Sequence, residues 1–338
     1  MSQFTKVQVL VVEDEDLNKD LEWHQENINN NLVIHRLVLK TALAKPKKWL
    51  LKLKHLRVKA EELHISHSFD LVHISVAWNM AIIGRRISGD LEIPFYITEH
   101  STYFLSKKKF NYKKHMAYQA MRKAKAVFVV SDELRQHFQS KGVVNCSIIP
   151  NFINAELDQY TVSESRPYCF AHVTNWDIER KGTLEVLEAY RKIRETQECK
   201  MILIANKVEM NDMGLSKTDL SQLDIELYPG FAEPSEYYSC LSKAHCLVNF
   251  SNKETFGISV LEAVKMGLYT IYTRSGGPER FMREPWGAAM DVGDTAGLER
   301  NMEIAINEQK VIHSQVGERA QLFSAEEIFE EHIKVYNG

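Results

Sequence analysis

Short apolar runs alternate with stretches of helical periodicity along most of this chain, and the alternation limits the possible folds more than any other feature. The apolar runs, which we interpret as strands, lie at 7–12, 32–39, 70–76, 94–98, 126–131, 146–151, 168–173, 200–206, 225–230, 245–251 and 269–273. The helical stretches lie at about 46–63, 78–89, 110–124, 132–140, 181–196, 234–243, 257–266, 295–308 and 325–336. Strands separated by helices of this length indicate βαβ units and hence parallel sheets, so we predict an α/β fold.

The alternation is interrupted by the polar stretch FINAELDQYTVSESRP at 152–167. A polar segment that ends in proline is typical of a linker, and 338 residues suit two domains better than one core. We predict an N-terminal domain at 1–153, a linker at 154–167, a second domain at 168–322 and a C-terminal helix at 323–338 that can cross back to the first domain. Doubly wound domains bind ligands at the carboxyl ends of their strands.

The amino terminus and the cysteines indicate a cytoplasmic protein. The first residues, MSQFTKVQVLVVEDED, lack the apolar region of a signal peptide, and no apolar run reaches the ~18 residues of a membrane helix. Five cysteines without a CxxC spacing indicate reduced thiols, and they do not predict a metal site.

Charge is divided unevenly along the chain. Residues 1–153 carry 23 Lys and Arg against 15 Asp and Glu, and the remaining residues carry 19 against 30. Two basic stretches, 27–60 and 100–131, hold no acidic residue. This distribution suggests that the first half faces an anionic surface, although solvated helix faces would give the same pattern. No motif or aromatic-basic pattern indicates nucleic acid as a partner.

Residues 45–63, KPKKWLLKLKHLRVKAEEL, combine Trp49 and several leucines with many lysines. A basic amphipathic helix of this kind can lie on an anionic membrane surface, and the basic residues within 106–125 can contribute. This interpretation predicts a peripheral position on the inner face of the membrane. In the alternative, the leucines face the core and the lysines face water, and the sequence leaves both possibilities open.

The stretch SNKETFGISVLEAVKMG (251–267) places two acids on either side of a predicted helix start. The preceding strand should deliver Glu254 to the carboxyl edge of its sheet, and Gly257 lets a ligand approach the backbone. Glu262 lies further along the helix, where a carboxylate can accept hydrogen bonds from ribose hydroxyls. The backbone amides at this helix start, which suit a diphosphate, are those of Phe256, Gly257, Ile258 and Ser259. We also assign Thr255 to donor binding. Two acids on a solvated helix face are the alternative interpretation.

Five segments together resemble the retaining glycosyltransferases of family four, which have the GT-B fold. The stretch just described resembles the E-x7-E motif of that family. The other segments are PFYITEHSTYF (94–104), KAKAVFVVSDELRQHF followed by CSIIPNFIN (123–138 and 146–154), HVTNWDIERKGTLEVLEAY (172–190) and RSGGPERFM (274–282). In order and spacing the likeness covers roughly residues 65–310. It implies two Rossmann-like, doubly wound domains that face a central cleft.

The resemblance implies a role for each matching residue. Glu254 matches the glutamate beside the donor sugar, and Glu262 matches the one that holds the nucleotide ribose. Lys181 matches the lysine that neutralises the donor diphosphate, whose charge grows as it leaves. His100 matches a histidine near the donor sugar and the acceptor. His100, Lys181 and Glu254 are therefore the catalytic residues that the resemblance implies.

Neighbouring motif positions extend the predicted site. The family usually has an arginine on the loop before its lysine, but that place falls here at Asn175 or Trp176, and Arg180 directly precedes Lys181. We assign Asn175 and Arg180 to donor binding. The residues assigned to loops near the donor or acceptor are Glu99, Gly276 and Gly277.

The amino-terminal part departs from the family pattern. Members normally open with a strand, a glycine-containing loop and a helix, whereas no glycine precedes Gly84 in this sequence. The stretch VQVLVVEDED resembles the second strand of the family. We therefore expect the first strand-loop-helix unit to be missing.

The activity that the resemblance implies is transfer of a hexose with retention from a UDP- or GDP-sugar, without a metal ion or other cofactor. The acceptor would be a glycan or a lipid-linked sugar in cell-envelope polysaccharide synthesis, and a lipid-linked acceptor would explain the basic first domain. Two alternatives stay open. One is a weakly active or inactive GT-B protein that binds nucleotide or glycan as an assembly partner, and the other is a nucleotide-sugar epimerase.

Overall fold

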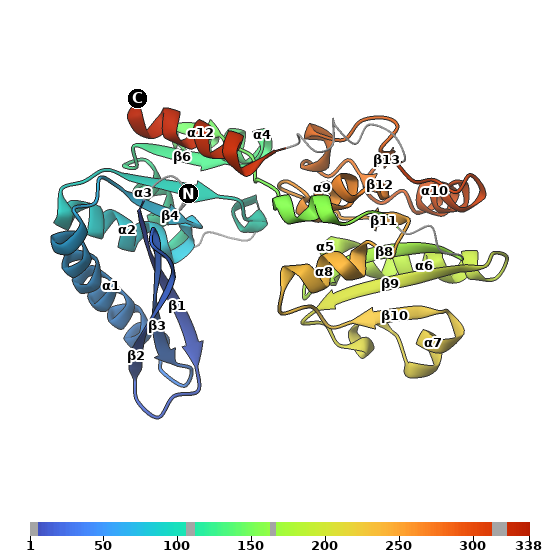
Figure 1. The fold of residues 1–338 in the computed structure, drawn as a ribbon, viewed down its shortest axis with the longest axis horizontal. Coiled ribbons are helices and arrows are strands. Elements are labelled where there is room, and N and C mark those ends of the chain that lie inside the picture. Colours follow the sequence, from blue (N-terminus) through green and yellow to red (C-terminus); the bar gives the residue numbers. More distant parts are fainter. Residues whose placement is uncertain (1–5, 106–111, 163–166, 313–322) are drawn as a thin grey trace. The chain divides into compact units, whose positions relative to one another are not determined.

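The computed structural model describes residues 6–105, 112–162, 167–312 and 323–338. The chain forms two compact units, Met1–Ile148 and Ile149–Gly338, which we call unit 1 and unit 2 (Figure 1).

Unit 1 begins with a three-stranded sheet in the order β1-β3-β2, the long dark blue ribbon of Figure 1. Strand β1 (Val7–Glu15) runs parallel to β3 (Leu32–Lys40), and β2 (Leu21–Asn29) pairs with β3 in the antiparallel direction. The sequence did not predict β2, because LEWHQENIN is polar and most of its side chains are exposed. Pairing with the apolar strand β3 gives this segment its strand conformation.

The second sheet of unit 1 is fully parallel and has the order β4-β5-β6-β7. Its strands are β4 (Val72–Ser75), β5 (Phe95–Glu99), β6 (Ala126–Val129) and β7 (Cys146–Ile148). The helices of the unit are α1 (Lys45–His67), α2 (Ala77–Leu91), η1 (Thr102–Leu105), α3 (Tyr112–Met121) and α4 (Asp132–Ser140). Helix α4 begins where Ser131 accepts a hydrogen bond from the backbone N–H of Leu134, a common N-terminal cap.

Helix α1 packs one face into the core of unit 1. Leu56 is fully buried there, and Trp49 and Leu53 are partly buried against the same cluster. Leu50 points away from the core and is 64% exposed. For most of the apolar residues in 45–63, the structure therefore supports the alternative in which they face the core.

Unit 2 is built on one parallel sheet of six strands in the order β10-β9-β8-β11-β12-β13. The strands are β8 (Tyr168–Asn175), β9 (Cys199–Asn206), β10 (Ile225–Tyr228), β11 (Cys246–Asn249), β12 (Tyr269–Thr273) and β13 (Gly287–Met290). Numbered in chain order, these strands have the arrangement 3-2-1-4-5-6 of a Rossmann-type sheet. All strands are parallel, but the order in which the chain adds them reverses between β8 and β11. Ligands of such sheets bind at the carboxyl ends of the strands at this reversal.

Helices α5 (Ile178–Lys181), α6 (Thr183–Arg194), α7 (Lys217–Gln222), α9 (Ile258–Met266) and α10 (Thr295–Asn307) contact strands of the unit 2 sheet. The other helices of this part of the chain are η2 (Ala155–Gln159), η3 (Met210–Met213), α8 (Pro234–Leu241), η4 (Pro278–Arg280) and α12 (Ala325–Asn337). Strand β11 shows how the core forms, because all four of its residues are buried. Continuous apolar runs of this kind are typical of parallel strands covered on both faces.

Each strand and helix that the sequence predicted overlaps an observed element, so the α/β assignment is confirmed. The expected helix at 181–196 is divided, because Gly182 adopts a left-handed conformation between α5 and α6. Three longer elements were missed: β2, β13 and α7. No helix in the described parts of the chain is long and apolar enough to cross a membrane.

Candidate functional site

Two loops meet at the reversal of the unit 2 sheet. One follows β8 and contains α5, and the other follows β11 and leads into α9. Lys181 at the end of α5 and Glu254 in the second loop form an ion pair, with 2.6 Å between Nζ and Oε1. The two residues are 73 positions apart in the sequence, yet the sheet topology brings them together.

A second cation lies beside this pair. The Arg180 guanidinium is 3.7 Å from Glu254 Oε1, and its Nε donates to Asp177 at 3.0 Å. Ser251 Oγ also donates to Glu254 Oε1, at 2.8 Å. Arg180 thus adds a second positive charge to the cluster around Glu254.

Glu254 is 7% exposed, and the groups around its carboxyl control its charge. Burial alone would raise the pKa of Glu254, but the charge of Lys181 and the hydrogen bonds from Lys181 and Ser251 outweigh this effect. The pKa is therefore held below its ordinary value, and the carboxylate is ionised at neutral pH.

Backbone hydrogen bonds connect the loops that carry these side chains. Asn252 N–H donates to the Arg180 carbonyl at 2.8 Å, and Glu254 N–H donates to the Ser275 carbonyl at 3.0 Å. The Gly276–Gly277 loop after β12 is thereby joined to the same site. Gly277 packs directly on the backbone of Phe256, where a Cβ atom would overlap it. The predicted glycine loop is thus part of the unit 2 site.

Helix α9 begins at Ile258, after Gly257 with φ of 86°. No side chain caps the first backbone amides of this helix. Uncapped amides at a helix start attract an anion such as phosphate. Thr255 and Phe256 are buried beneath this turn, and Ile258 is 49% exposed. The helix start predicted from the sequence is confirmed within one residue.

Glu262 lies on α9 and is partly buried. Burial raises the pKa of Glu262 to about 7, and a hydrogen bond from the Tyr237 hydroxyl acts in the opposite direction. That hydrogen bond is 3.0 Å long. Asn175 serves the local turn, since its Oδ1 accepts from Asp177 N–H at 3.1 Å.

The other predicted residues, Glu99 and His100, belong to unit 1 at the end of β5. Glu99 is fully buried and accepts hydrogen bonds from Ala77 N–H at 2.8 Å and Ser101 N–H at 2.7 Å. Burial raises its pKa to about 7. Glu99 thus holds the backbone around His100, and desolvation of the imidazole lowers the pKa of His100.

The structure therefore brings Arg180, Lys181, Glu254 and the Gly276–Gly277 loop into one cluster in unit 2. It adds three partners that sequence reasoning missed, namely Asp177, Ser251 and Tyr237. Ser251 precedes Glu254 by three residues, a turn spacing that was visible in the sequence, whereas nothing in the sequence pointed to Tyr237. Across the described ranges, no three His, Cys, Asp or Glu side chains gather as metal ligands.

Replacing Gly182 by alanine should destabilise unit 2 by about 2 kcal/mol. Gly182 has φ of 62°, and an added Cβ would contact the backbone oxygen of Phe250. The midpoint of urea unfolding measures the effect. Gly89→Ala is the matched control, because an added Cβ there meets no atom within 4 Å and the position is helical. Equal midpoints for Gly182→Ala and wild type would contradict the expected strain.

The fold and the side-chain geometry define an α/β protein with a cluster of charged residues at the reversal point of a Rossmann-type sheet. The sequence profile of Glycosyltransferase Family 4 matches residues 6–157, and that of Glycosyl transferases group 1 matches residues 161–322. These matches together span most of the chain. The chain therefore belongs to the family-four type of glycosyltransferases.

Solved structures with the GT-B fold are similar over nearly the whole chain. Sucrose-phosphate synthase of Thermosynechococcus elongatus has a TM-score of 0.74 at 15% identity, covering 98% of this chain and 88% of that one. HepE of Anabaena in complex with UDP has a TM-score of 0.71 at 16% identity, covering 98% and 100%. At these identities the likeness shows the fold, which is GT-B.

Two curated relatives match part of the sequence. N-acetyl-alpha-D-glucosaminyl L-malate synthase of Bacillus anthracis is 28% identical over 184 residues, which is 53% of this chain and 47% of the relative. The lipopolysaccharide core biosynthesis glycosyltransferase LpsE of Rhizobium meliloti (strain 1021) is 25% identical over 164 residues, which is 47% of this chain and 46% of the relative. The chain thus matches about half the length of these relatives.

Proposed function

We propose that this protein transfers a hexose, with retention and without a metal ion, from a UDP- or GDP-sugar to a glycan or lipid-linked acceptor. The observation that supports this most is the Lys181–Glu254 ion pair at the sheet reversal, beside the uncapped amides of α9. An ammonium group and a helix start together suit a diphosphate. Glu262 on the same helix is the candidate for the ribose.

In the reaction, the bond between the sugar C1 and the diphosphate oxygen breaks, and the diphosphate keeps the electron pair. Lys181 has three N–H donors, one of which binds Glu254, so the others can bind the leaving oxygens. Arg180 is held by Asp177 and by the Lys253 carbonyl, and it adds positive charge at short range. Fixed charges of this kind stabilise a leaving diphosphate without rearranging.

The acceptor hydroxyl then attacks C1 from the face that the diphosphate leaves, which retains the configuration, and its proton passes to an oxygen of the leaving diphosphate. We assign Glu254 and His100 to positioning the sugar, with Glu99 holding the backbone that carries His100. The comparisons are consistent with this proposal: structures of HepE contain UDP and glucose, and LpsE is named for lipopolysaccharide core synthesis.

A weakly active or inactive nucleotide-binding protein is the second candidate. It is favoured by the amino-terminal sheet, because β1-β3-β2 pairs separately from the four strands β4-β5-β6-β7. Calorimetric titration with UDP and GDP, next to a donor-hydrolysis assay with a panel of UDP- and GDP-sugars, separates the candidates. Binding with turnover of one donor supports the transferase. Binding without turnover of any donor favours the second candidate, and no binding of either nucleotide contradicts both.

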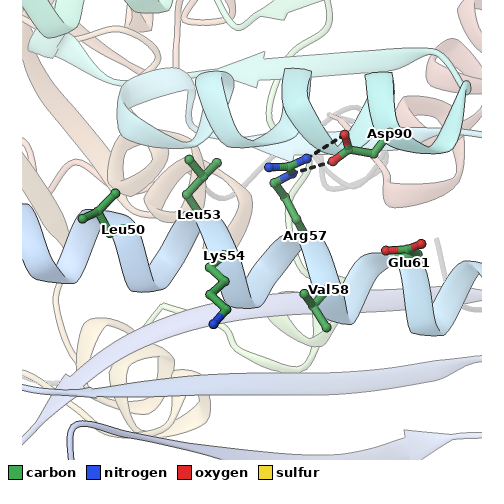
Figure 2. A pocket seen from close by; sticks show the side chains of 7 residues that line it. All are labelled: Leu50, Leu53, Lys54, Arg57, Val58, Glu61 and Asp90. Atoms are coloured by element: carbon green, nitrogen blue, oxygen red, sulfur yellow. Dashed lines mark hydrogen bonds and ion pairs between the residues drawn. The ribbon is translucent and has the colours of Figure 1, made fainter.

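The exposed face of α1 is a candidate contact for an anionic membrane surface. Leu50, Val58 and Ile65 are 64%, 56% and 79% exposed, and their spacing of eight and seven residues places them on one face. Leu50 and Val58 line a groove of about 580 Å³ with Lys54 (Figure 2). Such a stripe of apolar and basic residues suits insertion at the level of lipid headgroups.

Part of the basic charge of α1 is used inside unit 1. Lys47 pairs with Asp20 at 2.6 Å and Lys48 with Asp14 at 2.8 Å, and Figure 2 shows Arg57 bound to Asp90 of α2. Lys45 and Lys54 are exposed and form no ion pair with any described residue. These two lysines are therefore the main candidates for lipid phosphates. Of the second predicted stretch, 106–125, residues 106–111 lie outside the described residues.

The variant Lys45→Glu/Lys54→Glu should bind vesicles of phosphatidylglycerol and phosphatidylcholine at least about tenfold more weakly than wild type. Each cation near an anionic surface contributes about 1 kcal/mol. Co-sedimentation at low and high salt measures the effect. Lys217→Glu/Lys243→Glu is the control, because it makes the same change in net charge at exposed positions of unit 2. Equal loss of binding in both variants would contradict a specific role for α1.

A further inference from the structure

Glu262 and Tyr237 form a hydrogen-bonded pair that connects helices α9 and α8. The Tyr237 hydroxyl donates to Glu262 Oε2 over 3.0 Å. Burial and the nearby carboxylate raise the pKa of Tyr237 well above its ordinary value, so the hydroxyl remains a donor at every pH of interest. The other oxygen of Glu262, Oε1, accepts no hydrogen bond within the described part of the chain. One half of the carboxylate is thus fixed and the other half is open to a ligand.

The ring of Tyr237 is held by aromatic neighbours. Its centroid lies 6.3 Å from that of Phe231 and 5.5 Å from that of Tyr238. These neighbours are themselves held, because Phe231 packs on Tyr228 at 5.4 Å and Tyr238 packs on Tyr160 at 5.8 Å. A tyrosine has two side-chain torsions, and rings packed on it leave its hydroxyl little freedom. The hydroxyl therefore presents a fixed donor to Glu262.

Among the described residues of unit 2, Tyr237 is the hydrogen-bond donor to the Glu262 carboxylate. Tyr238, the other tyrosine on α8, packs on the ring of Tyr237, and burial together with the charge of Glu262 raises the pKa of Tyr238. Lys265, the basic residue on α9 itself, is paired with Asp158 at 3.2 Å. Without an adjacent cation, a partly buried glutamate depends on hydrogen bonds to remain ionised and to keep one orientation.

We propose that Tyr237 is a positioning residue that holds Glu262 so that its open oxygen accepts hydrogen bonds from the ribose hydroxyls of the donor nucleotide. This inference rests on the proposed role of Glu262 in donor binding. In this role, Tyr237 and Glu262 together select ribonucleotides over nucleotides that lack the ribose hydroxyls. A nucleotide that lacks the 2′ and 3′ hydroxyls leaves the buried carboxylate without its ligand donors, and such a loss weakens binding.

The test is calorimetric titration of the full chain with UDP, GDP and their 2′,3′-dideoxy counterparts. Wild type should bind the ribose form of its nucleotide at least about tenfold more tightly than the dideoxy form. Tyr237→Phe should weaken the ribose form by about fivefold to tenfold, because a freely rotating carboxylate must be ordered on binding. It should change the dideoxy form by less than about twofold, since that ligand does not use the pair.

Tyr238→Phe is the matched control, because it removes a hydroxyl from the next residue of the same helix without removing a donor to Glu262. Circular dichroism and thermal unfolding confirm that each variant is folded. In a Glu262→Ala background, Tyr237→Phe should have no further effect on the ribose form. A residue that acts only on the stability of the fold would weaken both nucleotides equally and would add to the effect of Glu262→Ala.

The pH dependence gives a second measurement. The quantity to follow is the affinity for the ribose form divided by the affinity for the dideoxy form. Both ligands carry the same diphosphate, so its protonation changes both affinities equally and does not change this ratio. Because ribose hydroxyls donate to the ionised carboxylate, the ratio should fall as pH decreases through about 7 in wild type. Tyr237 favours the ionised form, so the midpoint should move to higher pH in Tyr237→Phe.

Three results would overturn the inference in distinguishable ways. If wild type binds neither UDP nor GDP, the proposed function fails and the role of Tyr237 fails with it. If wild type binds a nucleotide and Tyr237→Phe keeps the full ribose preference, only the role of Tyr237 fails. Equal weakening of both ligands would show that Tyr237 supports the fold and does not position Glu262.

Discussion

Replacing Lys181 by alanine is expected to lower the rate of sugar transfer by about 10²- to 10³-fold, the effect of removing one fixed group that stabilises developing charge. The ammonium group lies at the carboxyl end of β8, where the sheet reverses, and it is mostly buried. A buried positive charge acts on a diphosphate with little screening by water. The dissociation constant for UDP or GDP should rise as well, because the charge also contacts the bound nucleotide.

Lys181→Ala also removes the closest cation from a buried carboxylate. Breaking one side of such a pair destabilises a protein by about 3–5 kcal/mol, so the folded fraction must be measured by circular dichroism at the assay temperature. Lys192→Ala is the control, because Lys192 is an exposed lysine of unit 2 that pairs with Glu299 at 2.6 Å. A folded Lys181→Ala protein with normal turnover and normal nucleotide affinity would contradict the role assigned to Lys181.

The variant Glu254→Gln should lower turnover by about 10²-fold while nucleotide affinity stays the same or increases. Because Lys181 lowers the pKa of Glu254, the wild-type carboxylate is ionised at neutral pH, and glutamine removes a full negative charge with little change in shape. The ammonium group of Lys181 then has no anionic partner at 2.6 Å and binds the diphosphate more readily. Single-turnover rates and calorimetric titration with the same donor measure the two effects separately.

Turnover and nucleotide affinity together distinguish the role of Lys181 from that of Glu254. Lys181→Ala should reduce both quantities, whereas Glu254→Gln should reduce turnover alone. Glu299→Gln is the control for Glu254→Gln, since it removes a partly exposed carboxylate that binds Lys192. If Glu254→Gln transfers sugar at the wild-type rate, Glu254 does not act on the donor sugar.

Strands β8, β9, β11 and β12 of unit 2 could be predicted from sequence because most of their residues are apolar and buried. Strand β11 is buried throughout and apolar up to Val248, and a run of this kind between helices has few other interpretations. Strand β2 could not be predicted, because LEWHQENIN has neither an apolar run nor a strict alternation. Its conformation comes from pairing with β3, which lies further along the chain.

Helix α1 shows the same division between local and tertiary information. Its existence followed from the sequence, but the direction of its apolar residues did not, because they occur around most of the helix. Packing against the unit 1 core buries Leu56 and partly buries Trp49 and Leu53, and it leaves Leu50 outside. Only the position of the neighbouring strands and helix decides which face becomes the surface.

The sequence by itself determined the class of fold, the helix start at Gly257 and the residue types of the site, because these depend on periodicity and on local backbone requirements. The tertiary structure decided which residues meet. The 3-2-1-4-5-6 strand order brings the loop after β8 to the loop after β11 and so joins Lys181 to Glu254. Contacts such as this, and the hydrogen bond from Tyr237 to Glu262, link positions that are distant in the chain, and no local pattern in the sequence encodes them.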